Sequence, residues 1–271
     1  MTDADAANKT GPIDRPLAAL LASLRRDNRQ QSGLAASMVP ADLDAAYRAA
    51  DDVTRELGWP RAGWKIAAIK PQMQRQLRTD RPIYGPVYEG WIHRSPHRFT
   101  GRTLLHPLVE MEFVVQLRSD LPPRSEPYVA GEVGDAVATM HPAIEMAECR
   151  FVHDAHFPPL PAIIADGCGS GSLVIGQAID DWVHQPIAGQ EVVLRVNGIV
   201  KRRGNAADAL GHPLEPLTWL ANALSRRGHG LLAGQFVSTG TLTGMQLARL
   251  GDSVEADFGR LGVVRLSYEP G

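Results

Sequence analysis

The segment that decides the fold is Leu105-His-Pro-Leu-Val-Glu110-Met-Glu112-Phe-Val-Val-Gln-Leu117. Its apolar side chains recur at every second position, a period typical of a β-strand. These residues are Val109, Met111, Phe113, Val115 and Leu117. The same period puts Glu110 and Glu112 on the opposite face, roughly 6–7 Å apart along the strand. Two carboxylates that share one face of a strand indicate either a solvent-exposed outer face or a binding site for a cation.

Both explanations are open from this pair alone, because antiparallel sheets commonly keep one face in water and Gln116 continues the polar face. A second apolar segment, at residues 140–150, contains Glu145. A carboxylate is seldom fully buried without a partner. If three carboxylates converge within about 4 Å, each like-charge contact costs roughly 4 kcal/mol at an effective dielectric constant near 20. Such a cluster must take up protons or hold a divalent cation, and an all-carboxylate site favours Mg²⁺ or Mn²⁺ over Zn²⁺.

The composition excludes several classes of protein. The chain has 271 residues, of which 44% are hydrophobic, and a formal net charge of −2. A chain with this charge has no excess of basic residues that would indicate binding to nucleic acid or to an anionic membrane. No apolar run is long enough to cross a bilayer, and the polar N-terminus lacks the hydrophobic segment of a signal peptide. Only two cysteines are present, Cys149 and Cys168, and we expect buried free thiols in a cytoplasmic protein.

The chain divides by character near residue 60. Residues 1–60 predict a loose tail followed by a helical segment, and residues 61–271 predict a β-rich catalytic domain broken by glycine and proline. An Asn197-Gly198 turn between β-branched residues predicts a hairpin. The other expected elements are helices over about 17–24, 41–57 and 214–227 and strands over 253–258 and 262–268.

Two further residues have side chains suited to proton transfer. In Gly63-Trp-Lys65-Ile66-Ala67 a lysine lies on a segment that is typical of a buried strand, where it is either an exposed edge residue or a cation beside the carboxylates. Three carboxylates with one Mg²⁺ leave a net charge near −1, which an ammonium group would offset, and that group could also move protons. Asp80 precedes a proline-containing turn and is either a turn residue or a second proton-transfer group.

Two glycine-containing segments are candidates for substrate binding. Asp166 follows an apolar run and precedes Gly167-Cys168-Gly169, where the backbone could approach a ligand closely. The segment Thr239-Gly240-Thr241 offers hydroxyl and backbone N–H groups suited to a carboxylate or an oxyanion. Both segments also suit ordinary turns, so these assignments are candidates only.

Together these segments resemble the fumarylacetoacetate hydrolase superfamily, within it most closely the 2-keto-4-pentenoate hydratase and 4-oxalocrotonate decarboxylase branch. The resemblance runs from about Ala62 to Tyr268. The matching motifs are GWKIA (63–67), DRPIYG (80–85), VEMEF (109–113), HPAIE (141–145), ADGCGS (165–170), NG (197–198), LGHPLEPLTWLANAL (210–224), AGQFVSTGT (233–241) and GDSVEADFGRLG (251–262).

The resemblance implies an α+β, β-rich fold, a mixed β-roll with an N-terminal helical segment. It implies that Glu110, Glu112 and Glu145 bind Mg²⁺ or Mn²⁺, that Lys65 is the catalytic cation, and that Asp80 also transfers protons. The implied reaction is the addition of water to a small 2-hydroxy-2,4-dienoate, or its 2-oxo-enoate tautomer, to give a 4-hydroxy-2-oxo acid. A homo-oligomer is also expected from the resemblance.

Three alternatives to hydration stay open. Decarboxylation and hydrolytic C–C cleavage of a related 2-oxo acid would use the same metal site. Hydrolysis would also require a water-activating His-Glu pair, which is missing between Lys65 and Asp80. A non-catalytic relative that binds a small acid is the third alternative. It stays open because the segments 67–70 and 167–169 lack hydroxyl and amide groups that the hydratases usually carry there.

Overall fold

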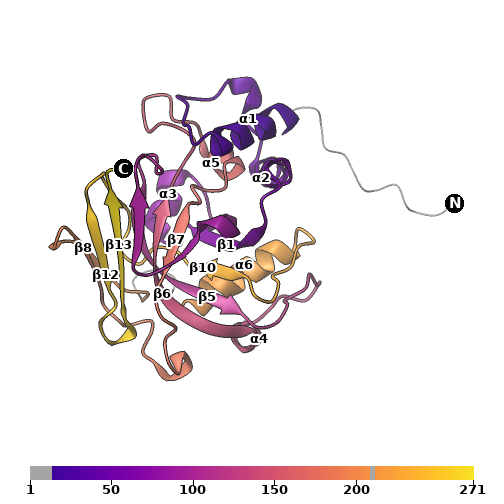
Figure 1. The fold of residues 1–271 in the computed structure, drawn as a ribbon. Coiled ribbons are helices and arrows are strands. Elements are labelled where there is room, and N and C mark those ends of the chain that lie inside the picture. Colours follow the sequence, from indigo (N-terminus) through magenta and orange to yellow (C-terminus); the bar gives the residue numbers. More distant parts are fainter. Residues whose placement is uncertain (1–13, 208–210) are drawn as a thin grey trace.

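Two β-sheets form the core of the protein in the computed structural model, which describes residues 14–207 and 211–271 (Figure 1). The larger sheet has the strand order β2-β1-β10-β5-β6-β7-β3, with β11 paired beside β5. Its strands are β1 (Arg61–Ala67), β2 (Ile83–Tyr88), β3 (Ile92–Arg94), β5 (Leu108–Leu117), β6 (Val137–Ala147), β7 (Ser172–Ile175), β10 (Phe236–Ser238) and β11 (Gln246–Leu247). The smaller sheet has the order β4-β13-β12-β8-β9. Its strands are β4 (His97–Thr100), β8 (Val192–Val196), β9 (Ile199–Gly204), β12 (Ser253–Asp257) and β13 (Val263–Glu269).

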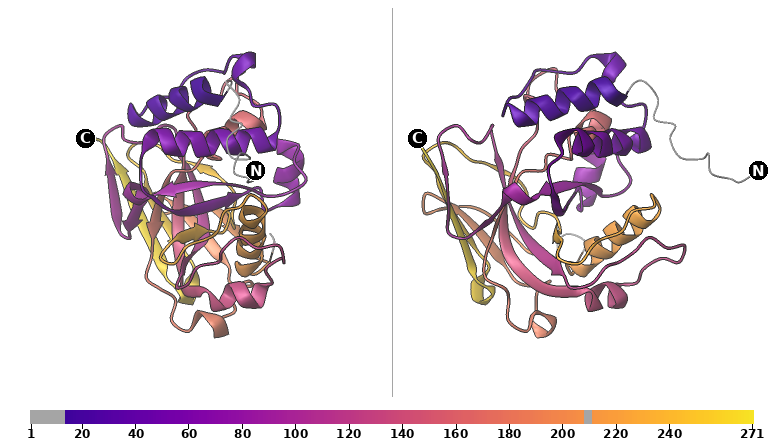
Figure 2. Two further views of the ribbon diagram at one scale, coloured as in Figure 1. Left: turned by 90° about the vertical axis from the view of Figure 1, so that its right-hand side faces the viewer. Right: turned by 45° about the vertical axis from the view of Figure 1, so that its right-hand side comes forward.

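The helices lie around these sheets, with α1 and α2 at one end of the molecule (Figure 2). They are α1 (Asp14–Arg26), α2 (Leu43–Leu57), α3 (Pro71–Leu77), α4 (Ala130–Asp135), α5 (Leu160–Ala165) and α6 (Leu214–Ser225). Short 3-10 turns are η1 (Ala36–Met38), η2 (Glu89–Trp91), η3 (Trp182–His184) and η4 (Gly259–Leu261). None of the helices in the described residues is both long enough and apolar enough to span a bilayer.

The central strand β5 is covered on both of its faces. On one face Met111 and Phe113 are buried in the main hydrophobic core, where Phe113 meets Phe258 beside the smaller sheet at 5.3 Å between ring centroids. On the other face Val114 packs in a second buried cluster with apolar side chains from β2, β6 and β7. The hypothesis of a solvent-exposed outer face is therefore wrong, because the larger sheet is curled and the face that carries Glu110 and Glu112 lies inside it.

The N-terminal helices pack onto later parts of the chain. Helix α2 is capped at its N-terminus by Asp42, whose side chain accepts a hydrogen bond from Ala45 N, and at its C-terminus by Gly58 in a left-handed conformation (φ 65°). Apolar residues of α1 and α2 share one cluster with Phe151 and Ala162. The helical segment is thus held by residues of the β-rich part, and the proposed division at residue 60 stays a prediction.

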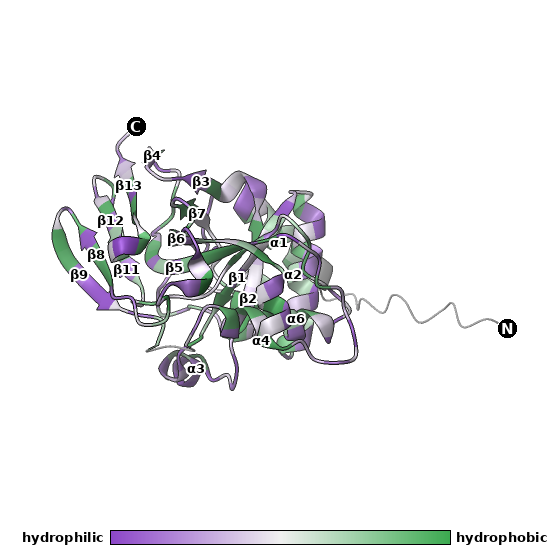
Figure 3. Cartoon of the chain, turned by 90° about the horizontal axis from the view of Figure 1, so that it is seen from below, coloured by the Kyte–Doolittle hydropathy of each residue, from purple (hydrophilic) through white to green (hydrophobic). Residues whose placement is uncertain are grey.

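Most of the expected elements are present within one or two residues of their predicted ends. Helices α2 and α6 and strands β12 and β13 are confirmed, and the Asn197-Gly198 turn joins β8 to β9 with positive φ at both residues. The short helices α3, α4 and α5 were not anticipated. Hydropathy explains why β5 was predicted and α3 was not (Figure 3). Strand β5 is strongly hydrophobic, whereas α3 is largely hydrophilic and has no buried residue. A short helix of that kind gives no periodic apolar signal.

Candidate metal centre

Strand pairing brings the three glutamates together. In the antiparallel ladder of β5 and β6, Glu110 is directly opposite Glu145, and Glu112 follows two positions along on the same face. The exposed fractions of these residues are 6% for Glu110, 1% for Glu112 and 0% for Glu145. One carboxylate oxygen from each lies within 4.8 Å of the others. Two acidic segments that are distant in the sequence therefore form one buried cluster of carboxylates.

Lys65 completes the cluster from a strand that does not touch β5. Strand β10 lies between them, pairing in parallel with β1, where Ser238 is opposite Lys65, and antiparallel with β5. The Lys65 ammonium Nζ is 3.4 Å from Glu145 Oε1 and 4.0 Å from Glu110 Oε2, and the lysine is only 2% exposed. The alternative of an exposed edge lysine is therefore wrong.

The charges in this cluster shift one another's pKa values. Burial by itself would lower the pKa of Lys65, but Glu145, Glu110 and Glu112 together raise it above its ordinary value. Burial raises the pKa of all three carboxyl groups. The pKa of Glu145 rises to about 7, because burial and the charge of Glu110 outweigh the attraction of Lys65. One ammonium thus offsets only part of the negative charge.

Glu112 is held by the segment that follows β10. Its Oε2 accepts a hydrogen bond from the backbone N–H of Gly240 at 2.8 Å and another from the hydroxyl of Ser238. Gly240 has φ +101°, and a Cβ there would lie 2.7 Å from the side chain of Ile69. Glycine is therefore required both by the backbone conformation and by the contact with the segment that follows β1.

The two threonines of this segment are engaged with the backbone. The Thr239 hydroxyl donates to the Phe113 carbonyl oxygen at 2.9 Å, and the Thr241 hydroxyl accepts from Gly244 N at 3.0 Å. The structure thus places Gly240 at the cluster through its N–H, while both threonine hydroxyls fix the shape of the turn. Ser238 was missed among the candidates although it belongs to the quoted motif at residues 233–241, because nothing in the sequence indicates which hydroxyl reaches Glu112.

Asp80 does not join the cluster in the structure. Its side chain is 76% exposed and forms an ion pair with the neighbouring Arg81 at 2.6 Å. The Arg81 hydrogen bond lowers the pKa of Asp80, which is the shift of a solvated carboxylate rather than of a buried acid. A role for Asp80 in proton transfer stays a prediction, and it would require the loop before β2 to move toward Lys65.

Asp166 is buried but engaged elsewhere. Its Oδ1 lies 2.9 Å from Nη2 of Arg25 in α1, and its Oδ2 accepts from Arg150 N at 2.7 Å. The side chains of Arg25 and Asp166 are 3% and 0% exposed. This pair ties the first helix to the end of α5, so the structure supplies a structural role for Asp166, and its assignment to substrate binding stays a prediction.

Replacing Asp166 with asparagine should destabilise the fold strongly. Removing one partner leaves Arg25 buried without a counter-charge, which costs about 3–5 kcal/mol of unfolding free energy. Urea unfolding in EDTA measures the loss. The matched control is Asp52→Asn, because its partner Arg55 has a side chain that is 71% exposed; the loss there should stay below about 1 kcal/mol. Equal losses in the two variants would contradict the structural role.

The neighbourhood of the cluster contains one of the two cysteines. Cys168 and Cys149 are both free and buried, as the composition indicated. Cys168 donates a hydrogen bond from Sγ to the Tyr84 carbonyl oxygen at 2.8 Å, and burial raises the pKa of its thiol while Lys65 lowers it. This buried thiol is therefore neutral at physiological pH.

The cluster fits a hard dication. Neither carboxylate oxygen of Glu145 has a well-formed hydrogen bond to a described residue, although both are buried. At 4.8 Å each pair of carboxylates repels by about 3–4 kcal/mol at an effective dielectric constant of 20. Three convergent carboxylates with unused oxygens provide the donor set that Mg²⁺ and Mn²⁺ prefer, and they leave positions for water or a substrate.

The stability of the metal-free protein should fall as the pH rises. The pKa of Glu145 is about 7 in the folded protein against an ordinary 4.5, so between these values the folded state binds more protons than the unfolded state. The slope of unfolding free energy against pH is then negative in that range. Urea unfolding in EDTA at several pH values tests this, and Glu145→Gln should flatten the slope. A slope that is unchanged in this variant would argue against Glu145 as its source.

Comparison with known proteins gives the family. The profile of the fumarylacetoacetate (FAA) hydrolase C-terminal region matches residues 100–267, which include all three glutamates. The chain therefore belongs to the fumarylacetoacetate hydrolase family.

Two curated proteins and one solved structure show which members of the family the chain is similar to. The chain is 28% identical over 262 residues to the 2-keto-4-pentenoate hydratase of Burkholderia vietnamiensis, covering 94% of this chain and 98% of that protein. It is 27% identical over 206 residues to the 4-oxalocrotonate decarboxylase of Pseudomonas putida, covering 76% of each. A solved structure of 4-oxalocrotonate decarboxylase from Pseudomonas putida G7, complexed with magnesium and adipate, superposes with a TM-score of 0.85 at 22% identity over 94% of this chain and 96% of that one. This likeness confirms the β-rich fold.

Proposed function

We propose that the protein is a divalent-metal-dependent hydratase of the 2-keto-4-pentenoate hydratase type. It would add water to a 2-oxo-enoate, the tautomer of a 2-hydroxy-2,4-dienoate, forming a C–O bond at C4 and a C–H bond at C3 to give a 4-hydroxy-2-oxo acid. The observation that carries the proposal is the buried cluster of Glu110, Glu112 and Glu145 beside Lys65. Relatives named as this hydratase, which match most of the chain, support it.

The glutamates would hold Mg²⁺ or Mn²⁺. A bound ion of this kind supplies a Lewis acid for the oxygens of a 2-oxo acid. Glu112 is oriented for this task by Ser238 and by Gly240 N–H, so its position is set before any ligand arrives. Glu145 contributes two buried oxygens that have no well-formed hydrogen bond to a described residue, although the Lys65 ammonium lies 3.4 Å from one of them.

Lys65 would provide the charge balance and the proton. Because the carboxylates raise its pKa, the side chain is an ammonium group at neutral pH. Placed 3.4 Å from Glu145, it attracts an anionic substrate that three carboxylates would otherwise repel. It can donate a proton to the substrate and accept one back, as general acid–base catalysis requires. Burial of the whole cluster keeps bulk water away from this transfer.

Decarboxylation of a 2-oxo diacid is the second candidate. It rests on the decarboxylase among the relatives and uses the same residues. The two reactions differ in the bond that changes: hydration consumes water, whereas decarboxylation breaks a C–C bond and releases CO₂. Self-association is also expected and stays a prediction.

Incubation with defined substrates distinguishes the reactions. The purified protein with Mg²⁺ should hydrate 2-hydroxy-2,4-pentadienoate, seen as loss of the dienoate absorbance and appearance of a 4-hydroxy-2-oxo acid by mass spectrometry. The same mixture with a 2-oxo-enedioate tests for CO₂, and with an acylpyruvate for two fragments. EDTA should stop the reaction in each case. Metal binding without turnover of any of these acids would overturn the proposal in favour of a non-catalytic binding protein.

A further inference from the structure

Glu112 differs from Glu145 in how its two carboxylate oxygens are used. Both hydrogen bonds that described residues donate to Glu112 reach Oε2, one from the Ser238 hydroxyl and one from Gly240 N–H. Each oxygen of an ionised carboxylate has about two lone-pair sites. Both sites of Oε2 are therefore in use, and Oε1 is the oxygen that Glu112 keeps for a metal ion. The two oxygens of Glu145, by contrast, have no well-formed hydrogen bond to a described residue.

The two donors to Oε2 are placed by the strand that lies between β1 and β5. Ser238 is the last residue of β10, opposite Lys65 of β1 on one side and Val114 of β5 on the other, and it is fully buried. Directly opposed residues of neighbouring strands point to the same face, so the Ser238 hydroxyl lies on the face that carries the cluster. Gly240, two positions further on, is held at φ +101°. The orientation of the Glu112 carboxylate is therefore set by β10 and the turn after it.

The number of oxygens that a carboxylate can offer affects which dication it prefers. Ca²⁺ takes about six to eight oxygens and commonly uses both oxygens of one carboxylate, whereas Mg²⁺ requires a near-octahedral set of about six and usually keeps several waters. Three glutamates that each give one oxygen fill half of an octahedron and leave the other half for water or a small acid. When Glu112 is limited to Oε1, the centre withholds an oxygen that Ca²⁺ would otherwise use, and Mg²⁺ loses nothing.

We propose that Ser238 is a positioning residue that makes the metal centre select Mg²⁺ and Mn²⁺ over Ca²⁺, by restricting Glu112 to one ligating oxygen. This inference rests on the proposed metal centre and adds the choice of ion. In Ser238→Ala, Gly240 N–H still binds Oε2, but one lone-pair site of Oε2 becomes free and Glu112 can offer both oxygens. Mg²⁺ binding should then weaken about 10–100-fold, as when other residues that orient a metal ligand are lost. Ca²⁺ binding should be unchanged or tighter.

Titration calorimetry of the full chain with Mg²⁺, Mn²⁺ and Ca²⁺ measures this selectivity without reference to turnover. After EDTA treatment and its removal, the parent protein should bind Mg²⁺ and Mn²⁺ more tightly than Ca²⁺. Ser238→Ala should shift the ratio of Mg²⁺ to Ca²⁺ affinity at least about tenfold toward Ca²⁺. A change that only loosened the fold would weaken the binding of all three ions alike.

Crystals of the parent protein provide a second measurement that needs no variant. Grown with Mn²⁺ and, separately, with Ca²⁺, they should show Glu112 binding either ion through Oε1 alone. In both crystals Oε2 should keep its hydrogen bonds from Ser238 and Gly240.

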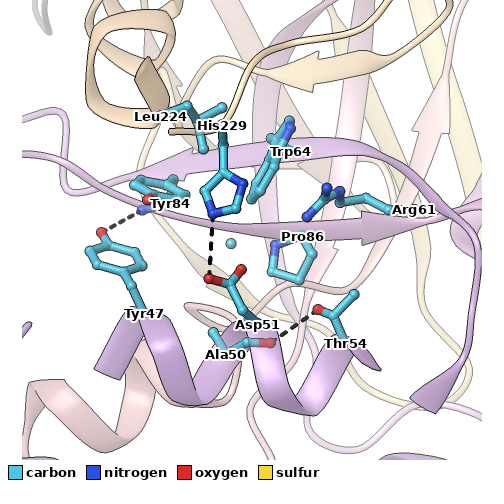
Figure 4. A pocket seen from close by; sticks show the side chains of 11 residues that line it. Tyr47, Ala50, Asp51, Thr54, Arg61, Trp64, Tyr84, Pro86, Leu224 and His229 are labelled. Atoms are coloured by element: carbon cyan, nitrogen blue, oxygen red, sulfur yellow. Dashed lines mark hydrogen bonds and ion pairs between the residues drawn. The ribbon is translucent and has the colours of Figure 1, made fainter. Parts of the chain in front are cut away.

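A hydroxyl on the reverse side of β1 provides the matched control. Trp64 and Lys65 are neighbours in β1, and because side chains alternate along a strand they lie on opposite faces. Thr54 of α2 lines the small pocket beside Trp64, where its hydroxyl donates to the Ala50 carbonyl oxygen at 3.0 Å (Figure 4). Thr54→Val removes this hydroxyl at similar volume and should leave the affinities for all three ions at their parent values.

Two kinds of negative result are distinguishable. The selectivity would be overturned, with the metal centre left in place, by any of three results: tighter binding of Ca²⁺ than of Mg²⁺ to the parent protein, a parental affinity ratio in Ser238→Ala, or a crystal in which both oxygens of Glu112 bind the ion. Failure of all three ions to bind the parent protein would overturn the metal centre itself, and the selectivity with it.

Discussion

Replacing Glu112 with glutamine will abolish metal-dependent turnover and weaken Mg²⁺ binding by more than about 100-fold. Loss of a residue that only supports a ligand costs about 10–100-fold in metal affinity, and loss of a charged ligand exceeds that. The glutamine carbonyl oxygen can still accept from Ser238 and from Gly240 N–H, so the local structure should survive. Titration calorimetry with Mg²⁺ and the hydration assay measure the two effects.

The stability of this variant in EDTA serves as its structural control. Glu145 and Glu110 both raise the pKa of Glu112, which shows that the three carboxyl groups repel one another when charged. The metal-free variant should therefore unfold at no lower a temperature than the metal-free parent. Glu255→Gln in β12, a partly exposed carboxylate paired with Arg195, should change neither metal binding nor turnover. Parental activity in Glu112→Gln would remove the cluster as the site of reaction.

Replacing Lys65 with methionine will lower turnover by about 10²–10⁴-fold, the usual contribution of a positioned acid–base group. Methionine fills similar space but carries neither charge nor proton. Metal affinity should persist or increase, because the ammonium that competes for Glu145 and Glu110 is gone. If Lys65 had only a structural role, its replacement would not lower turnover while metal binding is retained.

The comparison must be made at saturating Mg²⁺. Without the ion, the methionine variant holds three buried carboxyl groups with no cation beside them, and some loss of stability is expected in EDTA. Lys201→Met is a matched control, since Lys201 is an exposed lysine in β9 of the smaller sheet. It should keep most of the turnover. A Lys65→Met variant within tenfold of the parent rate would contradict the proposed role.

Local patterns account for the parts of the structure that were predicted well. The alternation around Glu110 and Glu112 depends only on neighbouring residues, and so do the cap at Asp42 and the turn at Asn197-Gly198. The burial of the glutamate face was not decided by that alternation. It required the second acidic segment and the resemblance to a family, since a period of two is the same for a wet face and a buried one.

Contacts between distant residues account for what was missed. Ser238 reaches Glu112 across 126 positions of sequence, through the insertion of β10 between β1 and β5. The contacts of Asp80 and Asp166 were likewise not predictable from the sequence. Each is an acid in a plausible turn, but its carboxylate pairs with an arginine, which is adjacent for Asp80 and 141 positions away for Asp166. No local pattern encodes that choice.

The position of β10 also has a consequence for the order in which the cluster is assembled during synthesis of the chain. Translation delivers Lys65 and all three glutamates in the first 145 residues, yet β1 and β5 never pair with each other. The piece that joins them, Phe236–Ser238, emerges near the end of the chain. A nascent polypeptide that stops short of it can still pair β5 with β6, which brings the three glutamates together, but it lacks the strand that places Lys65 beside them. Lys65 can therefore join the three glutamates only after β10 has been made.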